Sequence, residues 1–99
     1  MIIVAGSFEV DPAQREEFLR SREESVRRSR AEPGCIAYVF SADPIEPGRV
    51  CLFERWESKD ALRTHLAGMQ GGGAAPGGVP VLSAEVLQYE ISAVGPIGS

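Results

Sequence analysis

Apolar side chains on both faces of alternating segments restrict the fold of this chain more than any other feature. The first such segment, residues 2–10, is rich in β-branched and aromatic residues and alternates with the period of a strand. One face carries Ile2, Val4, Phe8 and Val10, and the other carries Ile3, Ala5, Ser7 and Glu9. A strand that is apolar on both faces must be covered on both faces, because exposed apolar surface is unfavourable in water.

Four further segments are expected to form strands. Residues 35–42 place Ile36, Tyr38 and Phe40 opposite Ala37, Val39 and Ser41, and residues 50–57 follow after the proline- and glycine-marked turn 43–49, so these two strands should pair as a hairpin. Near the C-terminus, Val79–Leu82 is predicted to form a short strand and Ala84–Val94 a longer one.

Two helices are expected between these strands. Asp11 is a suitable N-cap, Pro12 fits the first helical position, and Gln14 completes a capping-box pattern. This helix should run to about Ala31, where residues 32–34, Glu-Pro-Gly, end it. Ser58 is the expected N-cap of a second helix, whose inner face would carry Ala61, Leu62, His65, Leu66 and Met69.

The predicted order βαββαβ is that of the α+β ferredoxin-like fold, a four-stranded antiparallel sheet with both helices on one face. We expect one domain over residues 1–99, with the glycine-rich segment 71–78 as a flexible loop. The face away from the helices still needs a cover. A second copy of the sheet would provide it, so we expect a homodimer in which two sheets close an α+β barrel around Ile3, Ala37, Val39, Cys51 and Phe53.

Charge and composition exclude several classes of protein. The net charge of −4 disfavours a nucleic-acid partner, and no apolar run approaches the roughly 18 residues of a membrane-spanning helix. The N-terminus lacks the basic start of a signal peptide, which favours a cytoplasmic protein. There Cys35 and Cys51 are expected to be buried free thiols, although they could pair, and they match no zinc-site spacing, so no metal is expected.

A basic cluster, Arg27-Arg28-Ser29-Arg30, lies near the end of the first helix, after several glutamates. This arrangement complements the helix dipole and predicts a solvated helix face. The alternative is a clamp for a ligand carboxylate or phosphate.

Residues 53–65, Phe-Glu-Arg-Trp-Glu-Ser-Lys-Asp-Ala-Leu-Arg-Thr-His, resemble the Glu-x-Trp/Tyr, Ser/Asp, Ala-Leu, His signature of the antibiotic biosynthesis monooxygenase family. Residues 32–38, Glu-Pro-Gly-Cys-Ile-Ala-Tyr, are similar to that family's helix-to-strand junction. The resemblance covers residues 1–70 and the last strand. It implies a dimeric α+β barrel with a cavity between helices and sheet, used in some relatives to oxidise anthrones or quinols with O2 without metal or flavin.

Under this resemblance, the expected partners are a small aromatic substrate and O2, and no cofactor is expected. His65, the only histidine, is the expected base, because histidine is the residue whose unperturbed charge change falls near neutral pH. Trp56 would form a pocket wall or donate its indole N–H, and Ser7 could orient a substrate oxygen. The expected lining comprises Tyr38, Phe40, Phe53, Leu66 and Met69.

Structural roles compete with each of these assignments. His65 could instead hydrogen-bond Glu54 or a carbonyl to hold helix to sheet, Trp56 could be core or interface packing, and Glu54 an ion-pair or dimer-contact residue. Haem degradation is disfavoured, because the family branch that performs it relies on an asparagine and this chain has none.

Three functions therefore stand open from the sequence. The leading one is a cofactor-independent monooxygenase acting on a phenol, quinol or anthrone. The others are a non-catalytic ligand-binding or stress-associated dimer, and a cofactor-free isomerase or cyclase that uses His65 with Glu54 as an acid–base pair.

Overall fold

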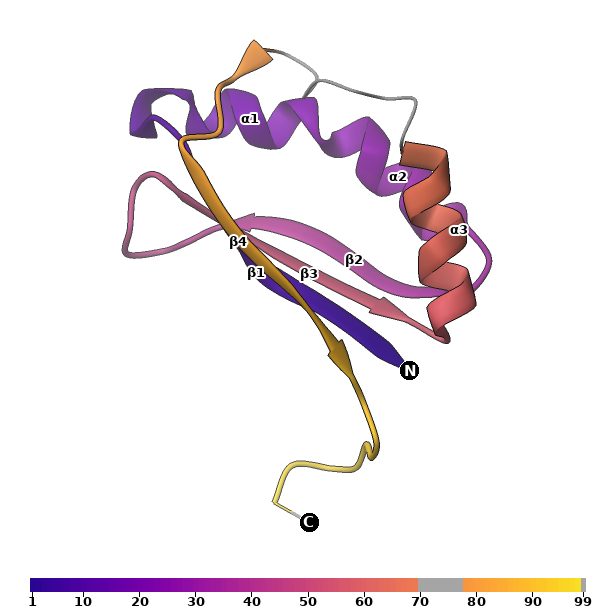
Figure 1. The fold of residues 1–99 in the computed structure, drawn as a ribbon. Helices are drawn as coiled ribbons and strands as arrows, with labels where there is room; N and C mark the ends of the chain where they lie inside the picture. Colours follow the sequence, from indigo (N-terminus) through magenta and orange to yellow (C-terminus); the bar gives the residue numbers. More distant parts are fainter. Residues whose placement is uncertain (70–77, 99) are drawn as a thin grey trace.

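The computed structural model describes residues 1–69 and 78–98, in which one antiparallel sheet is covered on one face by helices (Figure 1). The sheet has the strand order β2-β3-β1-β4. Its strands are β1 (Ile2–Glu9), β2 (Cys35–Ala42), β3 (Arg49–Trp56) and β4 (Ser83–Glu90). The covering helices are α1 (Arg15–Ser21), α2 (Glu23–Ala31) and α3 (Lys59–Met69). This arrangement confirms the expected α+β ferredoxin-like fold.

The register between β1 and β3 places the even-numbered residues of both strands on the helix-covered face, with Ile2 opposite Trp56 and Phe8 opposite Val50. Two groups of buried residues result. One lies under α3 and contains Ile2, Tyr38, Leu52, Trp56 and Leu62. The other lies under α1 and contains Val10, Phe18, Val50 and Val79.

The single long helix expected over residues 12–31 is wrong. A 3₁₀ turn, Pro12–Gln14, precedes α1, and the chain tightens at Arg22 before α2 begins. The hydroxyl of Ser21 donates to the carbonyl of Phe18 at 2.6 Å, a side-chain bond to the preceding turn that bends helices. The predicted N-cap is confirmed, since Asp11 accepts from the N–H of Ala13 at 2.9 Å, but Gln14 makes no capping bond.

Two predictions for strands are also wrong. Val79–Leu82 has no strand structure. Of its residues, Leu82 bonds to the sheet, where its N–H donates to the carbonyl of Glu9. The last strand ends at Glu90, four residues before the expected Val94.

In β2 the register shifts between Cys35 and Ala37. This bulge turns the side chain of Ile36 outward, to 46% exposure, instead of onto the face that carries Tyr38. The glycine-rich segment lies outside the described residues, except for Gly78.

The sheet face away from the helices carries a set of partly exposed apolar residues. Val39, Phe53, Leu87 and Tyr89 are each 38–50% exposed.

The two cysteines, Cys35 and Cys51, are free thiols as expected, but they are half-buried and not fully buried.

Candidate functional site

The only histidine of the chain is buried on the inner face of α3. Ser58 caps this helix as expected, since its hydroxyl accepts from the N–H of Ala61 at 3.1 Å. The cap sets the helical phase that directs Leu62 and His65 toward the sheet, where each is 3% exposed. Burial to this degree makes a hydrogen-bond partner inside the protein important for the imidazole.

The partner of His65 is Glu32, from the junction between α2 and β2. The Nδ1 atom of His65 lies 2.8 Å from Oε1 of Glu32. This junction is held against the start of α3, since Gly34 has a positive φ of 84° and a Cβ there would lie 2.6 Å from the Cβ of Ala61. A carboxylate at Nδ1 favours the tautomer that carries its proton on that nitrogen, which leaves Nε2 as a proton acceptor.

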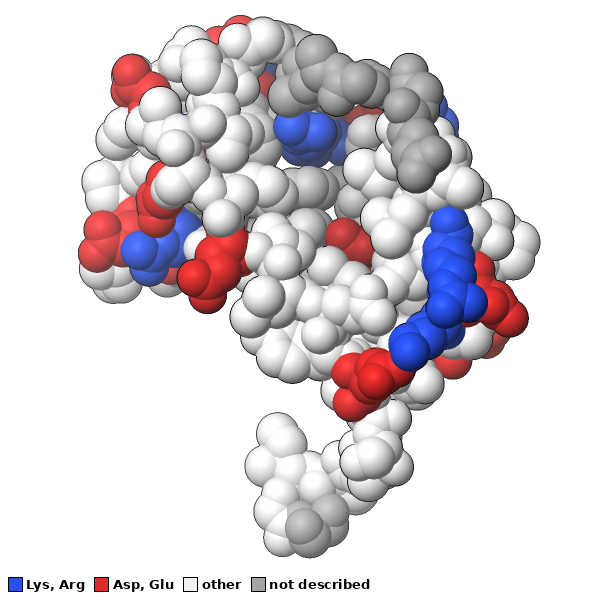
Figure 2. Space-filling model, viewed as in Figure 1, with Lys and Arg blue, Asp and Glu red and all other residues white. Residues whose placement is uncertain are grey.

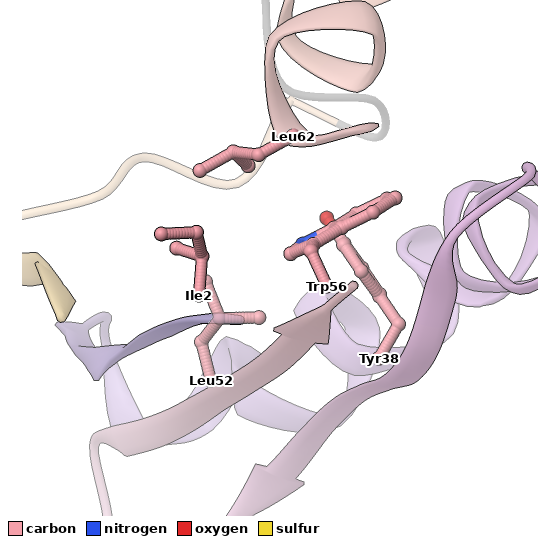
Figure 3. Close-up of a cluster of buried hydrophobic side chains, with 5 residues drawn as sticks. All are labelled: Ile2, Tyr38, Leu52, Trp56 and Leu62. Atoms are coloured by element: carbon pink, nitrogen blue, oxygen red, sulfur yellow. The ribbon is translucent and has the colours of Figure 1, made fainter. Parts of the chain in front are cut away.

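Two aromatic side chains of the sheet enclose the imidazole. The ring centroids of Trp56 and His65 are 4.7 Å apart with an interplanar angle of 35°, and those of Tyr38 and His65 are 5.4 Å apart at 63°. Figure 3 shows Tyr38 and Trp56 rising from neighbouring strands toward Leu62 of α3. The imidazole is therefore fixed by one hydrogen bond and by packing against two aromatic rings.

A second buried carboxylate lies next to this cluster. Glu54 is 5% exposed and accepts a hydrogen bond from the indole Nε1–H of Trp56 at 2.9 Å. Burial raises the pKa of Glu54 above its ordinary value, while the Trp56 bond and the proximity of His65 oppose that rise. Glu54 is thus a carboxyl group that keeps its proton to higher pH than usual, rather than the ion-pair residue considered above.

The phenol of Tyr38 stays protonated for the same reason. Burial raises its pKa to about 12, with a further increase from the charge of Glu54, and a side-chain hydrogen bond with Ser29 opposes the rise. Across the neutral range Tyr38 is therefore an uncharged wall of the site.

The structure brings together His65, Trp56, Glu54 and Tyr38. Phe40 lies beside them, with its ring centroid 6.0 Å from that of Tyr38. Leu66 and Met69 lie further along α3 and are 46% and 51% exposed. The other two expected site residues lie elsewhere.

Ser7 and Phe53 belong to the opposite face of the sheet. The register pairs Ser7 with Cys51 and Ala5 with Phe53. These are odd-numbered positions, whereas the even-numbered positions of β1 and β3 face the helices and His65. Strand side chains alternate between faces, so neither residue shares the space around His65 within one subunit.

The sequence interpretation missed two residues that the structure makes prominent. Glu32 was identified as part of a helix-ending signal, but its contact with His65 spans 33 residues and leaves no local pattern. Arg22 was assigned to a continuous helix, whereas it lies where α1 meets α2, with its Cζ atom 4.7 Å from the ring centroid of Phe18. A cationic residue four positions after Phe18 on the apolar side of the helix is the one signal that could have indicated it.

Arg22 also lines a pocket of about 180 Å³ between the helices and β2, formed with Leu19, Glu23, Val26, Arg27, Arg30 and Phe40. In the view of Figure 2 the molecule is hollowed between its helices and the sheet, and both acidic and basic side chains are visible inside the hollow. Within residues 1–69 and 78–98, no cluster of three or more metal-ligating side chains is present, and no helix there is long and apolar enough to span a membrane.

Residues 1–70 match the family model described as antibiotic biosynthesis monooxygenase. The protein of Bacillus subtilis named "Putative monooxygenase YcnE" is 31% identical over 93% of this chain and 99% of its own length. An uncharacterized Synechocystis protein is 41% identical over 66% of this chain, and the match spans 44% of that relative. A crystal structure described as a putative antibiotic biosynthesis monooxygenase from Deinococcus radiodurans superimposes with a TM-score of 0.80 at 26% identity, over the whole of both chains.

Proposed function

The chain belongs to the antibiotic biosynthesis monooxygenase family, and from that premise we propose that it oxidises a small aromatic phenol, quinol or anthrone with O2 and without a cofactor. One observation carries the proposal. His65 packs against two aromatic rings with its Nδ1 2.8 Å from Oε1 of Glu32, and with the proton on Nδ1 its Nε2 would be the proton acceptor. This is the arrangement that a general base requires.

In the proposed reaction, His65 takes a proton from the substrate, and the resulting anion is electron-rich enough to reduce O2 directly. For an anthrone, the methylene carbon loses two hydrogens and gains one oxygen atom as a ketone, and the second oxygen atom leaves as water. The protein contributes the base, its orientation by Glu32, and a water-poor aromatic environment. Phe40, Leu66 and Met69, which keep exposed surface, would contact the substrate ring, while the buried Trp56 and Tyr38 would hold the imidazole in place.

Oxygen uptake with a panel of anthrones and quinols tests this proposal. We expect uptake by the wild type that dialysis against a chelator leaves unchanged, and a fall of about 10²- to 10⁴-fold in His65→Gln, the range of general-base catalysis. Thr64→Ala is the matched control, because Thr64 lies on the same helix with its side chain exposed. Wild-type uptake no faster than in buffer would refute the monooxygenase, and a ligand-induced rise in melting temperature without turnover would then favour the binding protein.

A second candidate function is a cofactor-free isomerase. It is favoured by Glu54, a buried carboxyl group with a raised pKa that lies in the same aromatic cluster as His65 and could donate the proton that an isomerisation needs. Mass spectrometry of the product separates the two reactions, since an isomerase leaves the oxygen content of the substrate unchanged.

We further propose that the chain forms a homodimer through the helix-free face of the sheet. Val39, Phe53, Leu87 and Tyr89 make that face apolar, and contiguous apolar surface of this kind marks an interface. Ser7, on the same face, would then contact the partner rather than the substrate. Light scattering should give twice the chain mass of 10.6 kDa, and Phe53→Glu should lower it to the mass of one chain; a wild-type monomer would contradict this proposal.

A further inference from the structure

Arg22 is a half-buried cation with one hydrogen-bond donor left unsatisfied. Its Nε atom is buried without a hydrogen-bond partner among the described residues, and none of the ion pairs found there includes it. The segment 70–77 contains no acidic residue that could pair with it. Burial lowers the pKa of Arg22, which reports the cost of keeping the charge there.

A buried N–H without a hydrogen-bond partner costs free energy in the free protein, because it has lost its contact with water and gained no bond in exchange. Such a group is retained at a cost to stability where a ligand supplies the missing partner. The side chain is also preorganised, since its Cζ lies 4.7 Å from the ring centroid of Phe18 and 5.8 Å from that of Phe40. The guanidinium plane is therefore held by aromatic rings rather than by hydrogen bonds.

The surroundings of Arg22 indicate the chemistry of that ligand. The pocket that it lines has apolar walls from Leu19, Val26 and Phe40, and it carries three arginines against one glutamate. Arg30 already donates to the carbonyl of Tyr38 at 2.9 Å, and Arg27 lies 3.9 Å from Glu23 at the exposed surface, so Arg22 is the cation without a partner. Apolar walls with an excess of positive charge favour an anionic oxygen on an aromatic ring.

The size of the pocket limits how much of a ligand it can hold. Its volume of about 180 Å³ is below the roughly 300–1,000 Å³ of sites that enclose a whole drug-sized ligand. It therefore fits an acidic substituent with one ring. Phe40 and Tyr38 connect this pocket to the histidine site, because Phe40 lines the pocket, its ring packs on that of Tyr38, and Tyr38 packs on His65.

We propose that Arg22 is the recognition residue of a subsite for a carboxylate or phenolate group of the aromatic substrate. This inference rests on the proposed function, in that the same ligand is taken to reach His65. It narrows the substrate class to aromatic compounds that carry an acidic oxygen group.

Two probes that differ by one carboxylate test the inference: 1-hydroxy-2-naphthoate and 1-naphthol. Binding is measured by calorimetry and by the fluorescence of Trp56, the only tryptophan of the chain. A charge-assisted hydrogen bond predicts that the wild type binds the naphthoate at least about tenfold more tightly. Arg22→Met should remove this preference and change naphthol binding less than about threefold, because the apolar contacts are kept.

Two further variants control the experiment. Arg28→Met, an exposed position on the same helix, should keep the full preference, and Arg22→Lys should keep only part of it, because lysine lacks the planar fork. Arg22→Met should also melt close to the wild type, because it removes the unsatisfied Nε–H and keeps an apolar contact with Phe18 and Phe40. Equal wild-type affinity for the two probes, or a preference that persists in Arg22→Met, would overturn the inference.

Oxygen uptake is measured separately on the same proteins. A carboxylate preference that depends on Arg22 without any uptake would support the subsite and refute the monooxygenase. Oxygen uptake without a carboxylate preference would support the monooxygenase and refute the subsite.

Discussion

Replacing Glu32 with glutamine tests whether the carboxylate orients the histidine. The variant keeps the shape of the side chain and an oxygen that can accept from Nδ1 of His65, but it removes the charge. A hydrogen bond to a charged group contributes about 1.5–3 kcal/mol and a neutral one about 0.5–1.5 kcal/mol, so the loss is about 1 kcal/mol. His65 is 3% exposed and the Glu32 side chain 31%, so screening by water removes little of it. For a domain of this size, that loss lowers the melting temperature by about 4–8 °C.

The effect on turnover should exceed the effect on stability. Without the charge the tautomer and direction of His65 are less fixed, and we expect kcat to fall about 10- to 100-fold, as misplaced catalytic groups do. KM should stay within about twofold, because Glu32 is proposed to act through His65 and not on the substrate. Glu32→Asp should recover part of the rate. The assays are thermal unfolding and oxygen uptake, with Glu24→Gln, exposed on α2, as control. An unchanged kcat in Glu32→Gln would show that the carboxylate does not orient the base.

Three other predictions follow from the structure. Because folding raises the pKa of Glu54, ionisation of its carboxyl group costs stability as the pH rises above the ordinary pKa of 4.5. Glu54→Gln should therefore melt higher than the wild type at pH 7, and this gain should disappear below pH 4.5. A lower melting temperature of the variant at pH 7 would contradict the raised pKa. Tyr38 should not ionise in the folded protein until the pH nears 12, which ultraviolet titration against Tyr38→Phe measures; an early phenolate signal missing from that variant would be the contrary result. Gly6→Ala should unfold at lower urea concentration, because the added Cβ would collide with the backbone carbonyl of Glu85 in β4, and an unchanged midpoint would show that β4 is not held there.

Local pattern predicted most of the fold. Alternation identified β1, β2 and β3 to within about one residue at most ends, because each strand places one apolar face against the helices. Local pattern did not predict two features that depend on contacts between distant segments. Val79–Leu82 is apolar but joins β1 through the N–H of Leu82 and contains Pro80, which has no N–H to donate. The bulge at Ile36 shows only in the pairing of β2 with β3.

The candidate site was predictable in part for the same reason. Periodicity indicated which faces of the strands and of α3 carry His65, Trp56 and Tyr38, and the family resemblance made them candidate site residues. Glu32 and Arg22 are charged residues on or beside an amphipathic helix, where a solvated position is the ordinary expectation. Only tertiary contacts distinguish them, namely the bond of Glu32 to His65 and the position of Arg22 over Phe18.

Labelling with ¹⁸O₂ tests the central claim most directly. The purified protein, free of added metal and flavin, is incubated with an anthrone under ¹⁸O₂, and product and solvent are analysed by mass spectrometry. The account predicts one labelled atom in the ketone and one in water, at a rate that depends on His65. A ketone whose new oxygen comes from solvent, or a labelled ketone formed equally fast by His65→Gln, would contradict it.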